Sequence, residues 1–266
     1  MSSLFDDRNA LIRAIMGGAL RSQDTLAGSI KPPKPSGLPL GSILGIPQAK
    51  RRRVFFSFHH ADIMRVNNVR LSGEFVKSAS DSGREIEGFY DNSLWESKKR
   101  YGDDAIKDLL RDGVKNSSAV CVLVGTDTWA RRWVRYEIAR AIIDGRGLLA
   151  VHVNGLNHHQ LRIPHPFGEN PLNWLGVGKV QSSLQTNPTY YLFEKKTRWD
   201  GLQYVFDWLR YGEYTLPVSR PRWLADPAPG WVMPLSANAS VYDYIGGSGA
   251  KNIGAWIDGA AVAAGH

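Results

Sequence analysis

Apolar residues form short, nearly continuous runs along the central part of this 266-residue chain, at 54–58, 86–90, 119–125 and 148–153. Each run has the length of a strand and lacks the polar alternation of a half-exposed strand, which is typical of strands buried on both faces. Segments in which apolar residues follow helical spacing lie between and after these runs. We therefore predict an α/β fold, in which a parallel sheet is flanked by helices.

Two of the helical segments are well defined, at 105–114 and 128–143. The second follows a buried strand, and residues 126–128, between the strand and the helix, supply side chains suited to capping a helix. The residues predicted to form the stripe that packs on the sheet are Ala130, Val134, Ile138, Ala141 and Ile142.

The N-terminal part of the chain has a different pattern. Residues 1–26 contain apolar positions at helical spacing, whereas residues 27–53 are basic and rich in proline without any periodicity. We predict an N-terminal helix followed by an extended linker. The helix is either an oligomerisation or partner-docking element or a cap on the main domain, and we favour the first interpretation.

Residues 54–266 are predicted to form one domain. Within it, the segment 154–235 is rich in Pro, Trp and Tyr, and we interpret it as an elaborated excursion from the domain. Strands are expected there at 189–193 and 204–208. Apolar residues at helical intervals over 253–264 predict a closing helix.

Composition narrows the possible functions. The single cysteine, Cys121, lies in an apolar run, so it is expected to be a buried thiol and not a nucleophile. Six of the 33 basic residues lie between 28 and 53, and the other 27 nearly balance 25 acidic ones, so the net charge of +8 does not favour a nucleic-acid-binding domain. No apolar stretch approaches the roughly 18 residues of a membrane span, and the first residues do not resemble a signal peptide. We expect a cytoplasmic protein.

Glu137 and Trp133 are the most informative pair of residues. They are four residues apart on the predicted helix after the third strand, so they lie on one flank of it. The loops that follow parallel strands meet at one edge of the sheet, where ligands bind. There, an indole and a carboxylate suit a cationic aromatic substrate. The alternative is an exposed ion pair between Glu137 and Arg140, with Trp133 as an ordinary packing residue.

Two loops contribute further candidates at the same edge. Phe58 and His59 follow the first strand, and Asp91 and Trp95 follow the second. Neighbouring histidines are poorly placed to share one ion, so no metal site is expected. Arg65 either pairs with a phosphate or lies on the exposed face of the first helix, and we favour the exposed position. The chain has neither a glycine-rich phosphate loop nor a GxSxG element.

Taken together, these segments resemble a known family, the TIR-like proteins of Thoeris anti-phage systems. The resemblance rests on residues 54–59, 65–67, 93–96 and 132–138, and on 241–244 with the closing helix. It implies a flavodoxin-like TIR fold that carries an N-terminal helix and linker extension. It also implies an enzyme that cleaves NAD+ as its substrate, needs no cofactor and makes a cyclic ADP-ribose-type signal in defence against phage.

The same resemblance assigns roles to residues. Glu137 matches the catalytic glutamate, and the residues expected to bind the substrate are Trp133, Phe58, His59, Asp91 and Trp95. Expected partners are a second copy of the chain through TIR surfaces, a phage-derived trigger, and a downstream effector reached through the nucleotide signal. The alternative function is a non-catalytic TIR scaffold or sensor that acts by protein–protein contacts.

Overall fold

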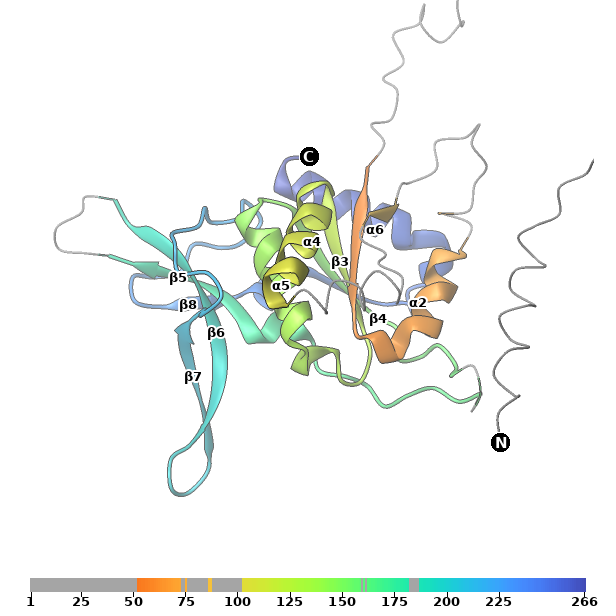
Figure 1. Cartoon of the computed structure of the whole chain (residues 1–266), viewed down its shortest axis with the longest axis horizontal. Coiled ribbons are helices and arrows are strands. Elements are labelled where there is room, and N and C mark those ends of the chain that lie inside the picture. The colour runs from red at the N-terminus through yellow and green to blue at the C-terminus, as the bar shows by residue number, and fades with distance from the viewer. Residues whose placement is uncertain are drawn as a thin grey trace, which may run out of the picture. The chain divides into compact units, whose positions relative to one another are not determined.

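A parallel sheet of five strands forms the centre of the fold within the described residues, in the order β2-β1-β3-β4-β9. It belongs to a computed structural model (Figure 1) that describes residues 52–72, 75, 86–87, 102–158, 160, 162–181 and 187–266. The strands are β1 (Val54–Phe58), β2 (Ile86–Glu87), β3 (Ala119–Val124), β4 (Gly147–His152) and β9 (Ser240–Asp243). The predicted α/β fold with a parallel sheet is confirmed.

Helices cover both faces of this sheet (Figure 1). The helices are α2 (Ile63–Arg70), α4 (Asp103–Lys115), α5 (Arg132–Ile143) and α6 (Gly249–Ala264). Side chains alternate between the two faces of a strand, so Phe55 packs with α4 and α5, whereas Val54 and Phe56 pack with α2 and α6. Cys121 is fully buried in the second of these layers, as predicted. The predicted closing helix is confirmed as α6.

A second sheet, which is antiparallel, lies beside α5. Its order is β7-β6-β5-β8, and its strands are β5 (Leu175–Val180), β6 (Thr189–Trp199), β7 (Tyr204–Arg210) and β8 (Val232–Pro234). The strands predicted at 189–193 and 204–208 are confirmed as parts of β6 and β7, which form a long hairpin in Figure 1. The sequence did not predict β5 and β8.

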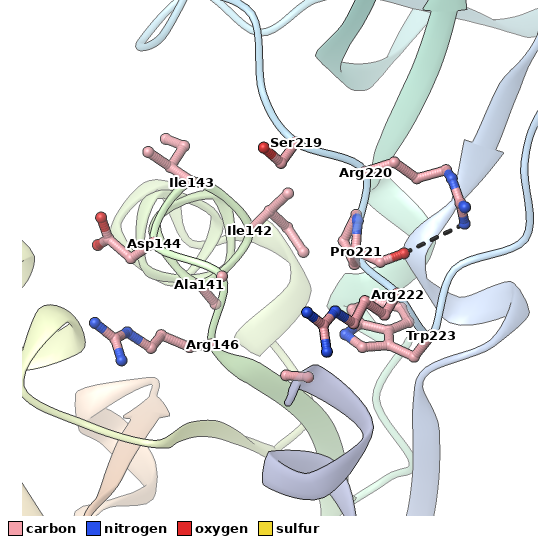
Figure 2. A pocket seen from close by; sticks show the side chains of 12 residues that line it. Ala141, Ile142, Ile143, Asp144, Arg146, Ser219, Arg220, Pro221, Arg222 and Trp223 are labelled. Carbon is pink, nitrogen blue, oxygen red and sulfur yellow. Dashed lines mark hydrogen bonds between the residues drawn. The ribbon is translucent and has the colours of Figure 1, made fainter. Parts of the chain in front are cut away.

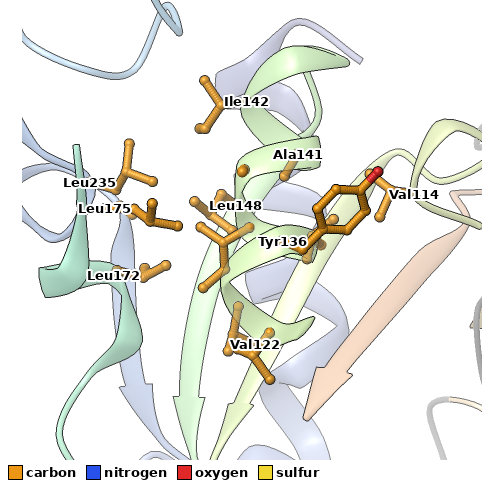
Figure 3. Close-up of a cluster of buried hydrophobic side chains, with 14 of the residues drawn as sticks. Val114, Val122, Tyr136, Ala141, Ile142, Leu148, Leu172, Leu175 and Leu235 are labelled. Carbon is orange, nitrogen blue, oxygen red and sulfur yellow. The ribbon is translucent and has the colours of Figure 1, made fainter. Parts of the chain in front are cut away.

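The two sheets share one hydrophobic core. Figure 3 shows Leu172, Leu175 and Leu235 facing Ile142 of α5 and Leu148 of β4, and all five side chains belong to one buried cluster. Helix α5 therefore packs on the parallel sheet and on the antiparallel sheet at once, which fixes its position.

The segment predicted as one helix, 128–143, is divided in the structure. Residues Thr128–Ala130 form a single 3-10 turn, Arg131 is extended, and α5 begins at Arg132. The Thr128 hydroxyl accepts a hydrogen bond of 2.8 Å from the backbone N–H of Gly125, so it closes the turn after β3 and does not cap α5. Ala130 is consequently exposed, and its predicted place in the packing stripe is wrong.

Several predictions fall on residues that are not described. The N-terminal helix at 1–26 and nearly all of the linker at 27–53 lie outside the described residues. Within the described part of the chain, no helix combines the length and the apolar character that crossing a membrane requires.

Candidate functional site at the carboxyl edge of the parallel sheet

The loops after β1 and β3 pack against each other at the carboxyl edge of the sheet. β1 and β3 are neighbours in parallel register, with Phe58 opposite Leu123. Beyond the strands, a Cβ atom on Gly125 would overlap the carboxylate of Asp62, so the two loops are in close contact. Burial lowers the pKa of His59, and the nearby Arg131 lowers it further. The predicted meeting of these loops at one edge is confirmed.

Glu137 lies on α5 beneath this edge. Its side chain is turned toward the sheet and is only 8% exposed. One carboxylate oxygen, Oε2, accepts a hydrogen bond from the hydroxyl of Ser57, the residue before the end of β1. Burial raises the pKa of Glu137 to about 8, while the hydrogen bond from Ser57 acts in the opposite direction. The site therefore contains a buried carboxyl group that is poised to titrate near neutral pH.

The alternative of an ion pair between Glu137 and Arg140 is wrong. Arg140 pairs instead with Asp144 at the end of α5, where Nη2 and Oδ1 are 2.6 Å apart. Glu137 faces the sheet, because its carboxylate accepts a hydrogen bond from Ser57 of β1 and the side chain is buried. Among the described residues, no basic side chain forms a salt bridge with Glu137.

Trp133 lies one turn before Glu137 and is half-buried. Its ring meets that of Tyr136 edge-on at 6.1 Å, and the guanidinium of Arg132 lies 4.6 Å from its centre. Trp133 also packs against the core formed by α4 and α5. It thus has the packing contacts that the alternative interpretation expected, and its role toward a substrate stays a prediction.

The remaining candidates divide between described and undescribed residues. Phe58 and His59 are half-buried and follow Ser57 directly in the chain, but the Phe58 side chain packs with the layer of α2 and α6, on the face of the sheet opposite Glu137. Their contact with a substrate stays a prediction. Asp91 and Trp95 lie outside the described residues.

Arg65 is buried, and the prediction that it lies on an exposed face is wrong. Its side chain is 2% exposed; Nη1 lies 2.9 Å from Oδ1 of Asp62, and Nε donates to the backbone carbonyl of Leu156 at 3.0 Å. An arginine in the first turns of a helix is usually solvated, which is why the pattern suggested exposure. Here it joins the loop after β1 to the loop after β4.

Comparison with known proteins agrees with this architecture. Residues 55–158 match the model of the Thoeris protein ThsB, TIR-like domain. A protein of Bacillus cereus (strain MSX-D12) named "Putative cyclic ADP-D-ribose synthase ThsB1" is 32% identical over 209 residues, covering 78% of this chain and 99% of the relative. The chain belongs to the Thoeris ThsB family. The predicted family and its flavodoxin-like TIR fold are therefore confirmed.

Ser57 is a site residue of this ThsB-family chain that the sequence analysis did not single out. It is completely buried, and it is the one polar residue in the strand VFFSF. A serine inside an apolar run carries no periodic signal, so pattern alone could not assign it to Glu137. The available cue was its position two residues after Phe55 on the same strand, which turns both side chains toward the same face of the sheet and the same helices.

Two cavities of this ThsB-family chain lie away from Glu137. One of about 310 Å³ separates the end of α5 from residues 219–223, and Figure 2 shows Arg222 reaching into it. It adjoins Arg146, just before β4, and so lies at the amino edge of the sheet. Another, of about 490 Å³, lies between α5 and the β6–β7 hairpin, with Arg135, Glu194 and Tyr211 among its lining residues. Among the described residues, no three His, Cys, Asp or Glu side chains gather as metal ligands.

Proposed function

We propose that this chain is an NAD+-cleaving TIR enzyme that produces a cyclic ADP-ribose-type signal in anti-phage defence. One observation carries the proposal: a buried carboxyl group, Glu137, lies near the carboxyl edge of the parallel sheet, the edge at which open α/β sheets bind ligands in general. Membership of the Thoeris ThsB family and the relative named as a cyclic ADP-D-ribose synthase support it.

The proposed chemistry needs one negative charge near the ribose that carries nicotinamide. Nicotinamide leaves with the electron pair of the bond to C1′, and the ribose develops oxocarbenium character as in glycoside cleavage. At ~4 Å and an effective dielectric constant near 20, a carboxylate stabilises such a charge by about 4 kcal/mol. This energy corresponds to a rate increase of roughly a thousandfold.

The raised pKa of Glu137 gives the reaction a pH dependence. In the free protein, burial keeps most of the carboxyl group protonated at neutral pH, since its pKa is about 8. The positively charged nicotinamide ring of NAD+ favours the ionised form when it binds. We therefore expect kcat/KM to rise with pH up to about 8. As the pH is raised, kcat should reach its plateau at a lower pH than kcat/KM does, because the bound substrate lowers the pKa of Glu137.

Formation of a cyclic product requires a hydroxyl of the same nucleotide to attack C1′ before water does. The hydroxyl oxygen forms the new bond to C1′ as nicotinamide departs, and its proton passes to a base or to solvent. The half-buried ring of Trp133, one helical turn before Glu137, favours this outcome, because it limits the access of water.

The decisive test is Glu137→Gln. The amide preserves the shape of the side chain but cannot carry the charge, so we expect NAD+ cleavage to fall by about a thousandfold while the protein still folds. Nicotinamide released from NAD+ by concentrated protein is the measurement, made with and without extract of phage-infected cells. Glu169→Gln changes an exposed glutamate and should leave cleavage unchanged. Normal turnover by Glu137→Gln would remove Glu137 from the mechanism.

An exposed aromatic surface on the β6–β7 hairpin favours the second function, a scaffold or sensor. Trp199, Tyr204 and Phe206 are 56%, 70% and 54% exposed, respectively. Such a surface suits protein contacts, whether with a second copy of the chain or with a phage-derived trigger. If the wild-type protein released no nicotinamide even with infected-cell extract, this second function would be preferred.

A further inference from the structure

The hydroxyl of Ser57 is buried in the apolar core, where a polar group without a hydrogen bond destabilises the fold. β1 is covered on both faces, and the Ser57 side chain lies on the α5 side, level with Val122 of β3. A hydroxyl removed from water destabilises the fold unless it is hydrogen-bonded. Ser57 meets this need by donating to Oε2 of Glu137. The hydrogen bond that joins β1 to α5 is thus accepted by the carboxyl group that the proposed reaction requires.

We propose that Ser57 is a positioning residue, whose hydroxyl holds the Glu137 carboxylate in one orientation at the carboxyl edge of the sheet. This inference rests on the proposed function and adds a second residue to its site. Ser57 acts through Glu137 and not on the substrate, because its own side chain is fully buried beneath α5.

Among the described residues, the Ser57 hydroxyl is the group that favours the ionised form of Glu137. On α5, Arg140 pairs with Asp144, and on the β1 side the next titratable residue is His59. The pKa of His59 is lowered by burial and by Arg131, which favours the neutral ring. Burial drives Glu137 toward protonation, and the Ser57 hydroxyl opposes it. Loss of that hydroxyl should therefore make ionisation harder and leave the carboxyl group free to rotate.

Three variants separate this role from ordinary packing. Ser57→Ala removes the hydroxyl, whereas Ser57→Thr retains it. Ser117→Ala is the matched control, because Ser117 is also buried and also makes one hydrogen bond, to the carbonyl of Val114 at 2.8 Å. Ser117 lies two residues before the start of β3, at the opposite edge of the sheet from Glu137.

The first measurement is nicotinamide release from NAD+ as a function of pH. We expect Ser57→Ala to lower kcat at neutral pH by about 10- to 100-fold, as is typical for losing a hydrogen bond to a charged group. The acidic limb of its pH profile should move to higher pH, with KM nearly unchanged. Ser57→Thr should have the kcat and the pH profile of the wild type. Ser117→Ala should also keep the wild-type pH profile, even if its Tm falls.

The second measurement needs no substrate. The Glu137 carboxyl group is titrated by carbon NMR of protein labelled at glutamate, with its resonance assigned from Glu137→Gln. We expect the midpoint in Ser57→Ala to lie at higher pH than in the wild type. Ser57→Cys, which offers a weaker donor of similar volume, should shift it in the same direction if the alanine variant does not fold.

The two measurements also separate this inference from the proposed function. If the wild-type protein never cleaves NAD+, the proposed function fails, and the titration alone decides whether Ser57 controls Glu137. If the variants that lack the hydroxyl keep both the wild-type midpoint and the wild-type pH profile, the role of Ser57 is overturned.

Discussion

Glu137 shows how one residue links the proposed function to the stability of the fold. Burial raises its folded pKa to about 8 from an ordinary value of 4.5. Below the ordinary value, the carboxyl group is protonated in both states and folding carries no ionisation cost. As the pH rises toward the folded pKa, the unfolded state releases its proton while the folded state retains it. Stability is therefore lost between these two values.

Glu137→Gln should accordingly be more stable than the wild type at alkaline pH, because glutamine cannot ionise. From the pKa of about 8 we expect an advantage of several kcal/mol, at most about 5, above that pH. The difference should shrink toward the small effect of the substitution itself below pH 4.5. Urea unfolding from about pH 4 to about pH 9 measures it. Glu169→Gln, at an exposed position, is the control, and a pH-independent difference for Glu137→Gln would contradict the burial of an ionisable group.

At this scale, the sequence predicted the residues that carry a family pattern and missed those defined by tertiary contacts. Glu137 and Trp133 emerged from helical spacing and from resemblance, and the structure places Glu137 at the predicted edge. The hydrogen bond from Ser57 and the burial of Arg65 depend on which segments pack together. No local pattern contains that information.

Among the structural elements, the loop and helix after β1 form a unit tied by one buried ion pair. Asp62 and Arg65 are 4% and 2% exposed, and Arg65 also reaches the loop after β4 through the carbonyl of Leu156. The loops at the carboxyl edge are thus connected from β1 to β4. This connection should hold the loop after β1, which begins at His59, in place at the carboxyl edge of the sheet.

Removing one member of the Asp62–Arg65 pair should lower the free energy of unfolding. Asp62→Ala leaves the Arg65 guanidinium buried without its carboxylate, so we expect a loss of about 3–5 kcal/mol in unfolding free energy. The matched control is Asp207→Ala, which breaks the pair of Asp207 with Arg198, two side chains that are 43% and 58% exposed. That change should cost less than about 1 kcal/mol. Equal losses in the two variants, measured by urea unfolding, would show that the Asp62–Arg65 pair is solvated in solution.

Elements with strong apolar patterns were predicted, whereas elements defined by neighbouring chain segments were not. β1, β3 and β4 are continuous apolar runs and were found from the sequence. β9 is short, and three of its four residues are exposed, so its pattern does not distinguish it from a loop. β5 contains two glycines whose Cβ atoms would collide with Val232 and Phe193, so close strand packing and not alternation determines its sequence.

For the molecule as a whole, the packing of α5 against two sheets makes the two sheets dependent on each other. Leu175, Val177 and Leu192 of the antiparallel sheet lie in the same buried cluster as Val134 and Ile138 of α5. The mostly buried ion pair of Arg135 and Glu194, whose Nε and Oε1 atoms are 2.9 Å apart, adds a polar contact between helix and sheet. That residues 54–266 form one domain stays a prediction, and this packing favours it.

A single cooperative unit should unfold in a single step. Leu192→Ala, in β6, removes a fully packed side chain and should cost about 2–5 kcal/mol. Leu202→Ala is the control: Leu202 is 90% exposed, and its loss should change stability by less than about 0.5 kcal/mol. Hydrogen exchange followed peptide by peptide through a urea series gives separate midpoints for β3 and β6. Because both strands pack through α5, we expect Leu192→Ala to lower the two midpoints together. If β6 lost its protection at lower urea while β3 kept its wild-type midpoint, the antiparallel sheet would be an autonomous attachment, and the position of Glu137 would depend on the parallel sheet alone.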